Sequence, residues 1–386
     1  MSKQVLTVSC KLSVTPEVAQ NIDATLQAFC DACNWINQTV DKKVMGKVSM
    51  QTMVYQDVRG RFELGANLAI RAIGRVCQSR KSAKGKKSEV KQFKPTSLDY
   101  DARTFSFNEH DSTVSLNLIQ GRAKGIKLDI GDYQKQLLQG KKPTSAELVK
   151  RKDSSYFLQI QVKDEPPKLI RTSSVLGVDL GRKDIAHTSV GDSFSGEQIN
   201  RIRDHYASLR ASLQRKATQG TRSTRRRARQ LLKRLAGKER RFQSWLNHQI
   251  SYRLIQQAKQ QSMAIALEDL SGIRERTNQQ PRSKQERRRS NSWAFYQLRS
   301  FLVYKAVKFG VPLVFVNPAY TSQTCHQCLH IHPEKGKSYR NGKTYRCGHC
   351  GWIGDSDFNG ANMISLLGAT VNSPRGSNLS CQIQGY

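Results

Sequence analysis

Residues 175–180 read VLGVDL, residues 264–270 read AIALEDL, and residues 347–362 read CGHCGWIGDSDFNGAN. The first two are short apolar runs that reach an acidic residue, Asp179 or Glu268, and such runs are typical of buried strands in an α/β sheet. Parallel strands end at the same edge of a sheet, so the pattern predicts that Asp179 and Glu268 are neighbours. A helix that starts near Asp357 would complete an acidic cluster.

Three carboxylates at one place favour hydrolysis of phosphodiester bonds. The reaction needs a deprotonated water and a stabilised leaving oxygen, and two divalent ions about 4 Å apart supply both. Carboxylates are the ligands that Mg²⁺ prefers, so we expect catalytic Mg²⁺, as two ions, at Asp179, Glu268 and Asp357. Glu268 is costly at the end of an apolar run unless it is paired or coordinated. For Asp179 and Asp357 a turn or cap role stays open, since Asp is common there.

Four cysteines form two Cys-x-x-Cys pairs, Cys325 with Cys328 and Cys347 with Cys350, separated by eighteen residues. This spacing predicts a tetrahedral zinc site rather than free surface thiols. A closed shell of four ligands leaves no open position, so the zinc is expected to be structural. The other cysteines are scattered and are interpreted as ordinary thiols: Cys10, Cys30, Cys33, Cys77 and Cys381.

The charge balance points to a polyanionic partner. Lys and Arg number 64 against 30 Asp and Glu, which gives a formal net charge of +34. Nucleic acid is the favoured partner because neutralised phosphates release condensed counterions, and a membrane surface is the second possibility. The sequence has no apolar run near the roughly 20 residues of a spanning helix and no N-terminal signal pattern, so a cytoplasmic protein is expected.

Two basic segments are candidate nucleic-acid contacts. Residues 223–241 are expected to form a helix that carries cations around its circumference, although a solvated helix face is an alternative interpretation. Residues 281–292 are expected to form a loop that guides single-stranded DNA toward the carboxylates. The candidate contacts are Arg225, Arg226, Arg227 and Arg229 in the first segment and Arg287, Arg288 and Arg289 in the second.

The front half has a different pattern. Residues 4–12 alternate as a half-buried strand, Thr15 and Pro16 cap a long amphipathic helix, and a second helical pattern covers residues 62–80. From 105 to 162 the period is two again, which indicates a β-rich module whose first strand lies at residues 4–12. The segment with Pro166 and Pro167 is the best boundary before the α/β pattern.

The motifs GVDLGRKDIA, LEDLSGIR and CGHCGWIGDSDFNGA resemble, in order and spacing, the three RuvC motifs and embedded zinc ribbon of the TnpB family. TnpB is the accessory protein of bacterial insertion sequences and is similar to the smaller type V CRISPR effector nucleases. The match is close over residues 175–367. It implies catalytic carboxylates at Asp179, Glu268 and Asp357, with Asp357 preferred to Asp355 because it stands two residues before Asn359. Gly360 departs from the family, which usually has Ala there.

The resemblance also implies the fold class and the domains. We expect an α+β multidomain protein with a β-barrel-like wedge domain at 1–14 and 88–168 and a helical recognition insertion at 15–87. An RNase H-like (RuvC) α/β domain is expected at 174–320 and 353–370, with a zinc ribbon at 321–352 and a mobile tail at 371–386.

The implied function is an RNA-guided, Mg²⁺-dependent DNA endonuclease encoded by a transposable element, with a guide RNA and target DNA as partners. Two alternatives remain: a nuclease-silent DNA-binding regulator of transposition, and a zinc-ribbon RNA-binding protein in which the acids are structural. The oligomeric state cannot be read from the residues.

Overall fold

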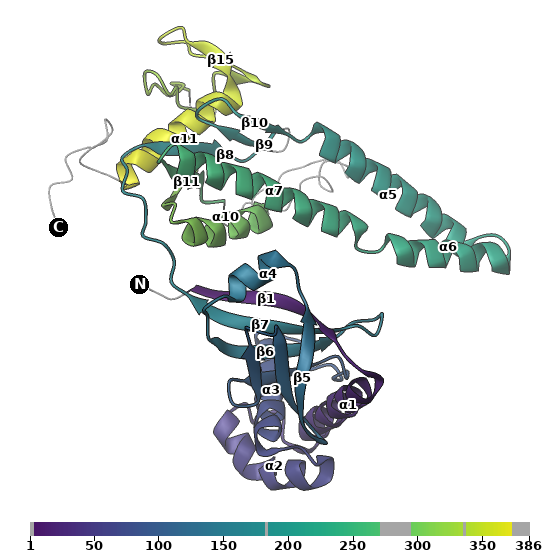
Figure 1. The fold of residues 1–386 in the computed structure, drawn as a ribbon. Coiled ribbons are helices and arrows are strands. Elements are labelled where there is room, and N and C mark those ends of the chain that lie inside the picture. Colours follow the sequence, from purple (N-terminus) through teal and green to yellow (C-terminus); the bar gives the residue numbers. More distant parts are fainter. Residues whose placement is uncertain (1–3, 182–183, 271–294, 335–336, 373–386) are drawn as a thin grey trace. The chain divides into compact units, whose positions relative to one another are not determined.

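The computed structural model describes residues 4–181, 184–270, 295–334 and 337–372 (Figure 1). The chain divides into two compact units, Met1–Glu165 and Pro166–Tyr386. The division falls at Pro166, inside the segment that the sequence marks as a boundary. Each unit is described by itself.

The first unit contains a seven-stranded antiparallel sheet in the order β2-β6-β7-β1-β5-β4-β3. The first strand of the chain lies between β5 and β7, as its alternating pattern predicts. The sheet is nearly closed like a barrel, because β3 approaches β6 and the Tyr100 hydroxyl in β2 donates to the Asn117 carbonyl in β4. The strands are β1 (Gln4–Ser13), β2 (Ser97–Asp101), β3 (Phe105–Asn108), β4 (Thr113–Leu118), β5 (Gly121–Asp129), β6 (Pro143–Lys150) and β7 (Tyr156–Asp164).

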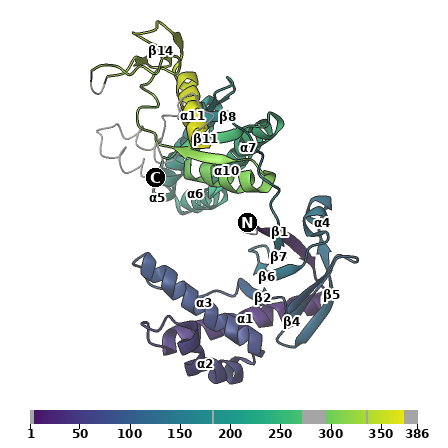
Figure 2. The same cartoon turned by 90° about the vertical axis from the view of Figure 1, so that its left-hand side faces the viewer.

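The helices α1 (Pro16–Thr39), α2 (Lys47–Phe62) and α3 (Ala66–Gly85) fill the connection between β1 and β2, and α4 (Asp132–Leu138) follows β5 (Figure 2). Thr15 caps α1 by accepting from the Val18 amide, which confirms the predicted helix start. The helix predicted over roughly 62–80 is confirmed as α3, although it begins later, at Ala66, and runs on to Gly85; helix α2, which ends at Phe62, was not predicted. The sequence did not reveal α2 because it buries only Met50, Val54 and Val58.

The second unit is built on a five-stranded sheet in the order β10-β9-β8-β11-β12. Strands β8, β11 and β12 are parallel, and β9 and β10 continue the sheet in antiparallel fashion. The strands are β8 (Val175–Asp179), β9 (Asp184–Thr188), β10 (Ser193–Ser195), β11 (Ala264–Glu268) and β12 (Leu313–Val316).

Helices cover both faces of this sheet. Helices α7 (Lys238–Gln260) and α10 (Phe295–Phe309) pack on the face that carries Leu176, Val178 and Ile265. Helix α11 (Ser356–Asn372) packs on the other face, which carries Val175 and Ala266. The alternation along each strand therefore places α11 in a different layer from α7 and α10.

Two helices and a small module complete the second unit. Helices α5 (Glu197–Thr218) and α6 (Arg222–Leu235) form a hairpin that extends away from the sheet (Figure 1). Strands β13 (Arg340–Asn341), β14 (Thr344–Arg346) and β15 (Ile353–Asp355) form a three-stranded sheet just before α11. Helix α11 includes residues 371 and 372 of the segment expected to be a mobile tail, and residues 373–386 lie outside the described residues. Within the described chain, no helix combines the length and apolarity needed to span a membrane.

Candidate active site and metal centres

Asp179 and Glu268 end two neighbouring parallel strands. Pairing runs from Val175 opposite Ala264 to Val178 opposite Leu267, so the next residue on each strand is Asp179 or Glu268. Neighbouring strands lie about 4.8 Å apart, and residues at matching positions share a face of the sheet. The sheet therefore brings together two acids that are far apart in the sequence.

Helix α11 adds Asp357 because its backbone lies very close to the sheet. A Cβ on Gly177 would lie 2.0 Å from the Ala361 carbonyl oxygen, and one on Gly368 would lie 2.3 Å from the Ala266 Cβ. The Ser365 hydroxyl donates to the Val175 carbonyl at 2.6 Å. Ala361 contacts Gly177, and the later Ser365 contacts the earlier Val175, so α11 runs antiparallel to β8. The start of α11 therefore lies at the carboxyl edge of the sheet.

The electrostatics show that the three carboxylates influence one another. The pKa of Asp179 is raised to about 7, first by burial and then by the negative charges of Glu268 and Asp357, while the Arg340 guanidinium lowers it. Burial also raises the pKa of Glu268, and a hydrogen bond from the Thr321 hydroxyl opposes that rise. Asp357 is 7% exposed. The structure thus brings Asp179, Glu268 and Asp357 to one edge, where burial and the two neighbouring carboxylates penalise the charged form of Asp179.

Cations from the small three-stranded module lie against this edge. The Arg340 Nη2 atom donates to Asp357 Oδ1 at 2.8 Å, and Lys343 Nζ lies 3.9 Å from Asp357 Oδ2. Lys343 also forms an ion pair with the buried Asp184 of β9. Sequence reasoning did not single out Arg340, Lys343, Asp184 or Thr321, because no spacing rule marks residues that meet the acids only in three dimensions.

The two neighbouring aspartates at the start of α11 have different roles. Asp355 Oδ1 accepts from the amides of Asp357 at 2.7 Å and Phe358 at 3.1 Å, so Asp355 caps the helix. Asp357 instead faces Arg340 and Lys343. The buried Asn359 accepts from the His326 amide at 3.0 Å and donates to the Thr324 carbonyl at 2.8 Å, which ties the first cysteine pair to this helix.

The four cysteines form a compact cluster that could hold a metal ion such as zinc. Their sulfur atoms all lie within 4.8 Å of one another. The Sγ distances between Cys325 and Cys350 and between Cys328 and Cys347 are both 3.7 Å. A tetrahedral ion with Zn–S bonds of 2.3 Å requires sulfur separations of about 3.8 Å. The donor set and its dimensions therefore fit one zinc ion.

The carboxylates are less tightly grouped than the cysteines. Within the part of the chain that the structure describes, the cysteine quartet is the one set of three or more metal-binding residues whose ligand atoms are gathered closely enough for one ion. The carboxylates repel one another when charged, and Arg340 and Lys343 lie among them.

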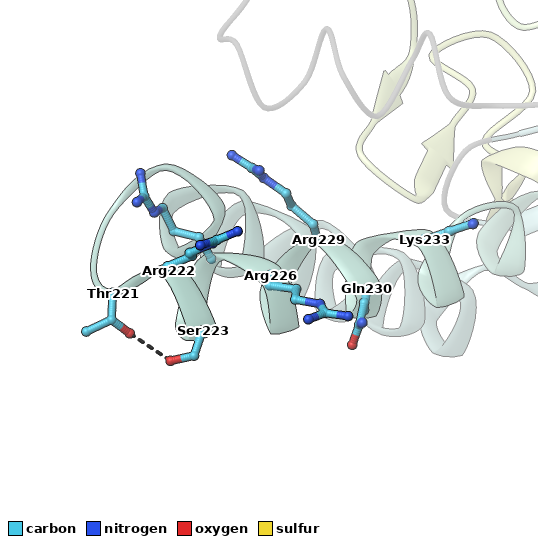
Figure 3. A pocket seen from close by; sticks show the side chains of 8 residues that line it. Thr221, Arg222, Ser223, Arg226, Arg229, Gln230 and Lys233 are labelled. Atoms are coloured by element: carbon cyan, nitrogen blue, oxygen red, sulfur yellow. Dashed lines mark hydrogen bonds between the residues drawn. The ribbon is translucent and has the colours of Figure 1, made fainter.

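The predicted arginines of α6 form a basic surface. Arg226, Arg227 and Arg229 are exposed, Arg225 is half-buried, and Ala228 is the one buried residue of this helix. An open hollow of about 1060 Å³ runs along α6, lined by Arg222, Arg225, Arg226, Arg229 and Lys233 among others. Figure 3 shows Arg226 and Arg229 pointing in different directions from the helix. Among the described residues no carboxylate pairs with these cations. Arg287, Arg288 and Arg289 lie outside the described residues.

Comparisons with known proteins agree with this organisation. The family described as Probable transposase matches residues 158–274, and the Cas12f1-like TNB domain matches residues 295–364. The CRISPR-associated endodeoxyribonuclease Cas12f1 of Sulfoacidibacillus thermotolerans is 27% identical over 286 residues, which cover 67% of this chain and 65% of that protein. The chain thus spans less than two thirds of this relative. The TnpB-like protein MJ0751 of Methanocaldococcus jannaschii is 28% identical over 244 residues, covering 60% of this chain and 82% of that protein.

Solved structures show a similar fold. The chain resembles the protein in a cryo-EM structure of a Cas12f1-sgRNA-target DNA complex with a TM-score of 0.60 at 14% identity, covering 92% of this chain and 83% of that one. It also resembles the mini-RNA-guided endonuclease CRISPR-Cas_phi3 with a TM-score of 0.50 at 10% identity, covering 97% and 94% of the two chains. At these identities the likeness concerns the α+β fold.

Proposed function

We propose that this chain, which its matches identify as a relative of TnpB and Cas12f1 proteins, is an RNA-guided DNA endonuclease that hydrolyses phosphodiester bonds at Asp179, Glu268 and Asp357. The matches confirm the resemblance that the sequence motifs indicate. The observation that carries the catalytic assignment is the convergence of these three acids at one sheet edge, where burial and then the charges of Glu268 and Asp357 raise the pKa of Asp179. Perturbed acids of this kind are typical of functional sites.

The architecture of the second unit supports an RNase H-like (RuvC) domain. Its sheet has two antiparallel strands beside three parallel ones, and the acids end the first strand and the fourth strand of this sheet in chain order. Helix α11 then supplies the third acid across the opposite face from α7 and α10. The nearly closed sheet and inserted helices of the first unit support wedge and recognition domains.

The acidic edge has the chemistry of a Mg²⁺ site. Asp179, Glu268 and Asp357 offer hard oxygen ligands, and bound Mg²⁺ would lower the pKa of a water and stabilise the leaving oxygen. Thr321 holds the Glu268 carboxylate by a hydrogen bond. Arg340 pairs with Asp357, so its guanidinium lies where a phosphate beside that carboxylate could accept its hydrogen bonds.

The cysteine quartet is proposed to hold structural zinc. It is closed by four sulfurs, and its core has little apolar content beyond Tyr345, Tyr339 and Trp352. A module of this size relies on metal binding for its folding energy. Because Asn359 ties the first cysteine pair to α11, the ribbon also fixes the helix start that carries Asp357.

The proposed partners are a guide RNA and target DNA. The net charge of +34 and the acid-free surface of α6 favour phosphate contacts at Arg225, Arg226, Arg227 and Arg229. Arg287, Arg288 and Arg289 are proposed to guide the DNA strand, on sequence grounds alone. Guide pairing would read the target sequence while the protein holds the heteroduplex by its backbone. The resemblance to TnpB further suggests that a transposable element encodes the chain.

A cleavage assay with matched acid substitutions tests this function. The full chain is purified with co-expressed guide RNA and incubated with a target plasmid and Mg²⁺. We expect Asp179→Ala and Glu268→Gln to lower the cleavage rate about 1000-fold, since the metal site contributes several kcal/mol. Asp269→Asn is the control, because Asp269 neighbours Glu268 but pairs with Arg299. Its rate should stay within about twofold of the wild type.

Two outcomes would contradict the proposal. Equal cleavage rates for the wild type and Asp179→Ala would show that the carboxylate centre does not catalyse the reaction. Guide-dependent DNA binding without cleavage in any variant would instead favour a nuclease-silent DNA-binding regulator.

A further inference from the structure

Aromatic side chains line the outer surface where α7 and α10 pack together. Trp245, His248 and Tyr252 of α7 are exposed, and Phe301 and Tyr304 of α10 lie beside them. Trp245 is 57% exposed and Tyr252 is 48% exposed. This surface belongs to the helix layer opposite α11, so it is separate from the layer that supplies Asp357.

Three of these rings contact one another across the two helices. Residues 245, 248 and 252 follow the helix repeat, so their side chains share one face of α7 over about 10 Å. The His248 ring stacks on Phe301 at a centroid distance of 3.8 Å, and Phe301 lies edge to face with Tyr304 at 5.9 Å. The Tyr304 hydroxyl lies 3.3 Å from His248 Nδ1. Contacts across the two helices therefore hold several of the rings in place.

A buried cation fixes the seam beneath these rings. Lys305 Nζ donates to the His248 carbonyl at 2.6 Å and to the Ser251 hydroxyl at 2.7 Å. It also lies 5.9 Å from the centre of the Tyr252 ring and 6.0 Å from that of Tyr304. Two aromatic faces on different helices are thus held by one ammonium group, which preorganises the surface.

Basic residues outnumber acidic ones on the two helices that carry these rings. The sequence has no Asp or Glu between Arg240 and Leu267, and none in α10. Arg253 follows Tyr252 in α7 and is exposed, and Lys259 and Lys308 lie over the Phe309 ring at 5.7 and 5.8 Å. Exposed rings next to cations match a strand that offers both unpaired bases and phosphates.

We propose that the α7–α10 surface is a stacking platform for unpaired nucleotides of a single-stranded nucleic acid, with Trp245, Tyr252 and Tyr304 contacting bases and Arg253, Lys259 and Lys308 contacting phosphates. The proposal deepens the proposed function in that it takes nucleic acid as the partner, but it does not require cleavage. A duplex binds less well, because its bases are already stacked and paired. Stacking accepts any base, so little sequence preference is expected.

Oligonucleotide binding to the full chain tests the platform without relying on catalysis. A fluorescein-labelled 20-nucleotide oligouridine is titrated with RNA-free protein in EDTA, and anisotropy gives the Kd. The double variant Tyr252→Ala, Tyr304→Ala should weaken binding about 10-fold or more, since each stacked base contributes substantially. The double variant Tyr252→Phe, Tyr304→Phe keeps both rings and should bind within about twofold of the wild type.

Two further measurements separate stacking from charge. An abasic strand of the same length offers phosphates alone, so wild type and the double Ala variant should bind it equally. The salt dependence of Kd should also be unchanged in that variant, because the phosphate contacts remain. If the double Ala variant does not fold, Trp245→Ala, which alters an exposed ring, serves in its place.

Some outcomes would overturn the platform while leaving the nuclease proposal intact. Wild-type affinity of the double Ala variant for oligouridine would do so, as would an equal loss of affinity for the abasic strand. A lower unfolding temperature with unchanged binding would show that the surface is a packing face for protein. In each case guide-dependent plasmid cleavage, measured separately, reports on the carboxylate centre.

Discussion

The cysteine ribbon and the acidic sheet edge gather their ligands in opposite ways. The ribbon takes two ligands from each of two short turns, and its sulfurs already lie at separations that suit one ion. The acidic edge takes single carboxylates from β8, β11 and α11, and burial together with the charges of Glu268 and Asp357 raises the pKa of Asp179. The ribbon is thus preorganised by local spacing, whereas the edge is assembled by topology and opposed by its own charge.

This difference assigns separate roles to the two centres. A preorganised closed shell favours a permanent ion that stabilises structure. The acidic edge is repulsive and already has Arg340 and Lys343 beside it. Such an edge favours metal ions that enter together with a charged substrate. The connection between them is Asn359, which joins the first cysteine pair to the helix that carries Asp357.

Removing the zinc site should have the largest effect on stability. We expect Cys347→Ser to lose bound zinc, because one of the four sulfur ligands is removed. The loss of stability should be large, because structural zinc contributes roughly 10 kcal/mol to folding of such modules. Cleavage should fall about 100-fold or more, since the start of α11 loses its anchor. Metal analysis of the purified protein gives zinc per chain, and Cys77→Ala, a buried cysteine outside the quartet, should keep its zinc. Full zinc content in Cys347→Ser would contradict a four-cysteine site.

Neutralising Asp179 should have a smaller, pH-dependent effect on stability. Its folded pKa of about 7 lies above the ordinary value of 3.8, so its favourable contribution is complete below about pH 4 and is lost as the pH rises through 7. In EDTA at pH 8, Asp179→Asn should therefore raise the unfolding temperature by roughly 2–4 °C, which corresponds to about 1 kcal/mol in a unit of this size. The gain should shrink toward pH 5, where the wild-type carboxyl is also protonated.

Repeating the unfolding measurement with Mg²⁺ tests whether Asp179 takes part in metal binding. Added Mg²⁺ should raise the unfolding temperature of the wild type at pH 8 more than that of Asp179→Asn, because only the wild type offers all three carboxylates. Asp269→Asn is the control and should respond to Mg²⁺ as the wild type does. If Asp179→Asn raised the unfolding temperature equally at pH 5 and pH 8, the gain would not come from removing the charge of Asp179.

The same contrast explains what the sequence could predict. Cys325, Cys328, Cys347 and Cys350 follow from spacing, and Asp179 and Glu268 follow from two apolar strands that end in acids. The sequence did not predict the contacts of Arg340, Lys343 and Thr321 with the acids. These residues lie in segments whose sequence patterns do not indicate which residues they contact in the fold. Helix α2 escaped prediction for a similar reason, since its buried stripe of Met50, Val54 and Val58 is sparse.

The smallest effect is expected at Gly360, which lies in α11 next to Asn359 and close to Asp179. A Cβ here would lie 3.1 Å from Asp179 Oδ2, which is closer than ordinary contact, so the carboxylate must move by a few tenths of an ångström. Ala also favours a helix over Gly by about 1 kcal/mol. We expect Gly360→Ala to raise the free energy of unfolding by less than that and to change the cleavage rate only a few-fold, since the family usually has Ala there. Gly60→Ala in α2 is the matched control, because nothing lies within 4 Å of its added Cβ. A full helix gain at Gly360, equal to that at Gly60 and with unchanged Mg²⁺ dependence of cleavage, would show that Asp179 is free to move and that the helix start does not set its position.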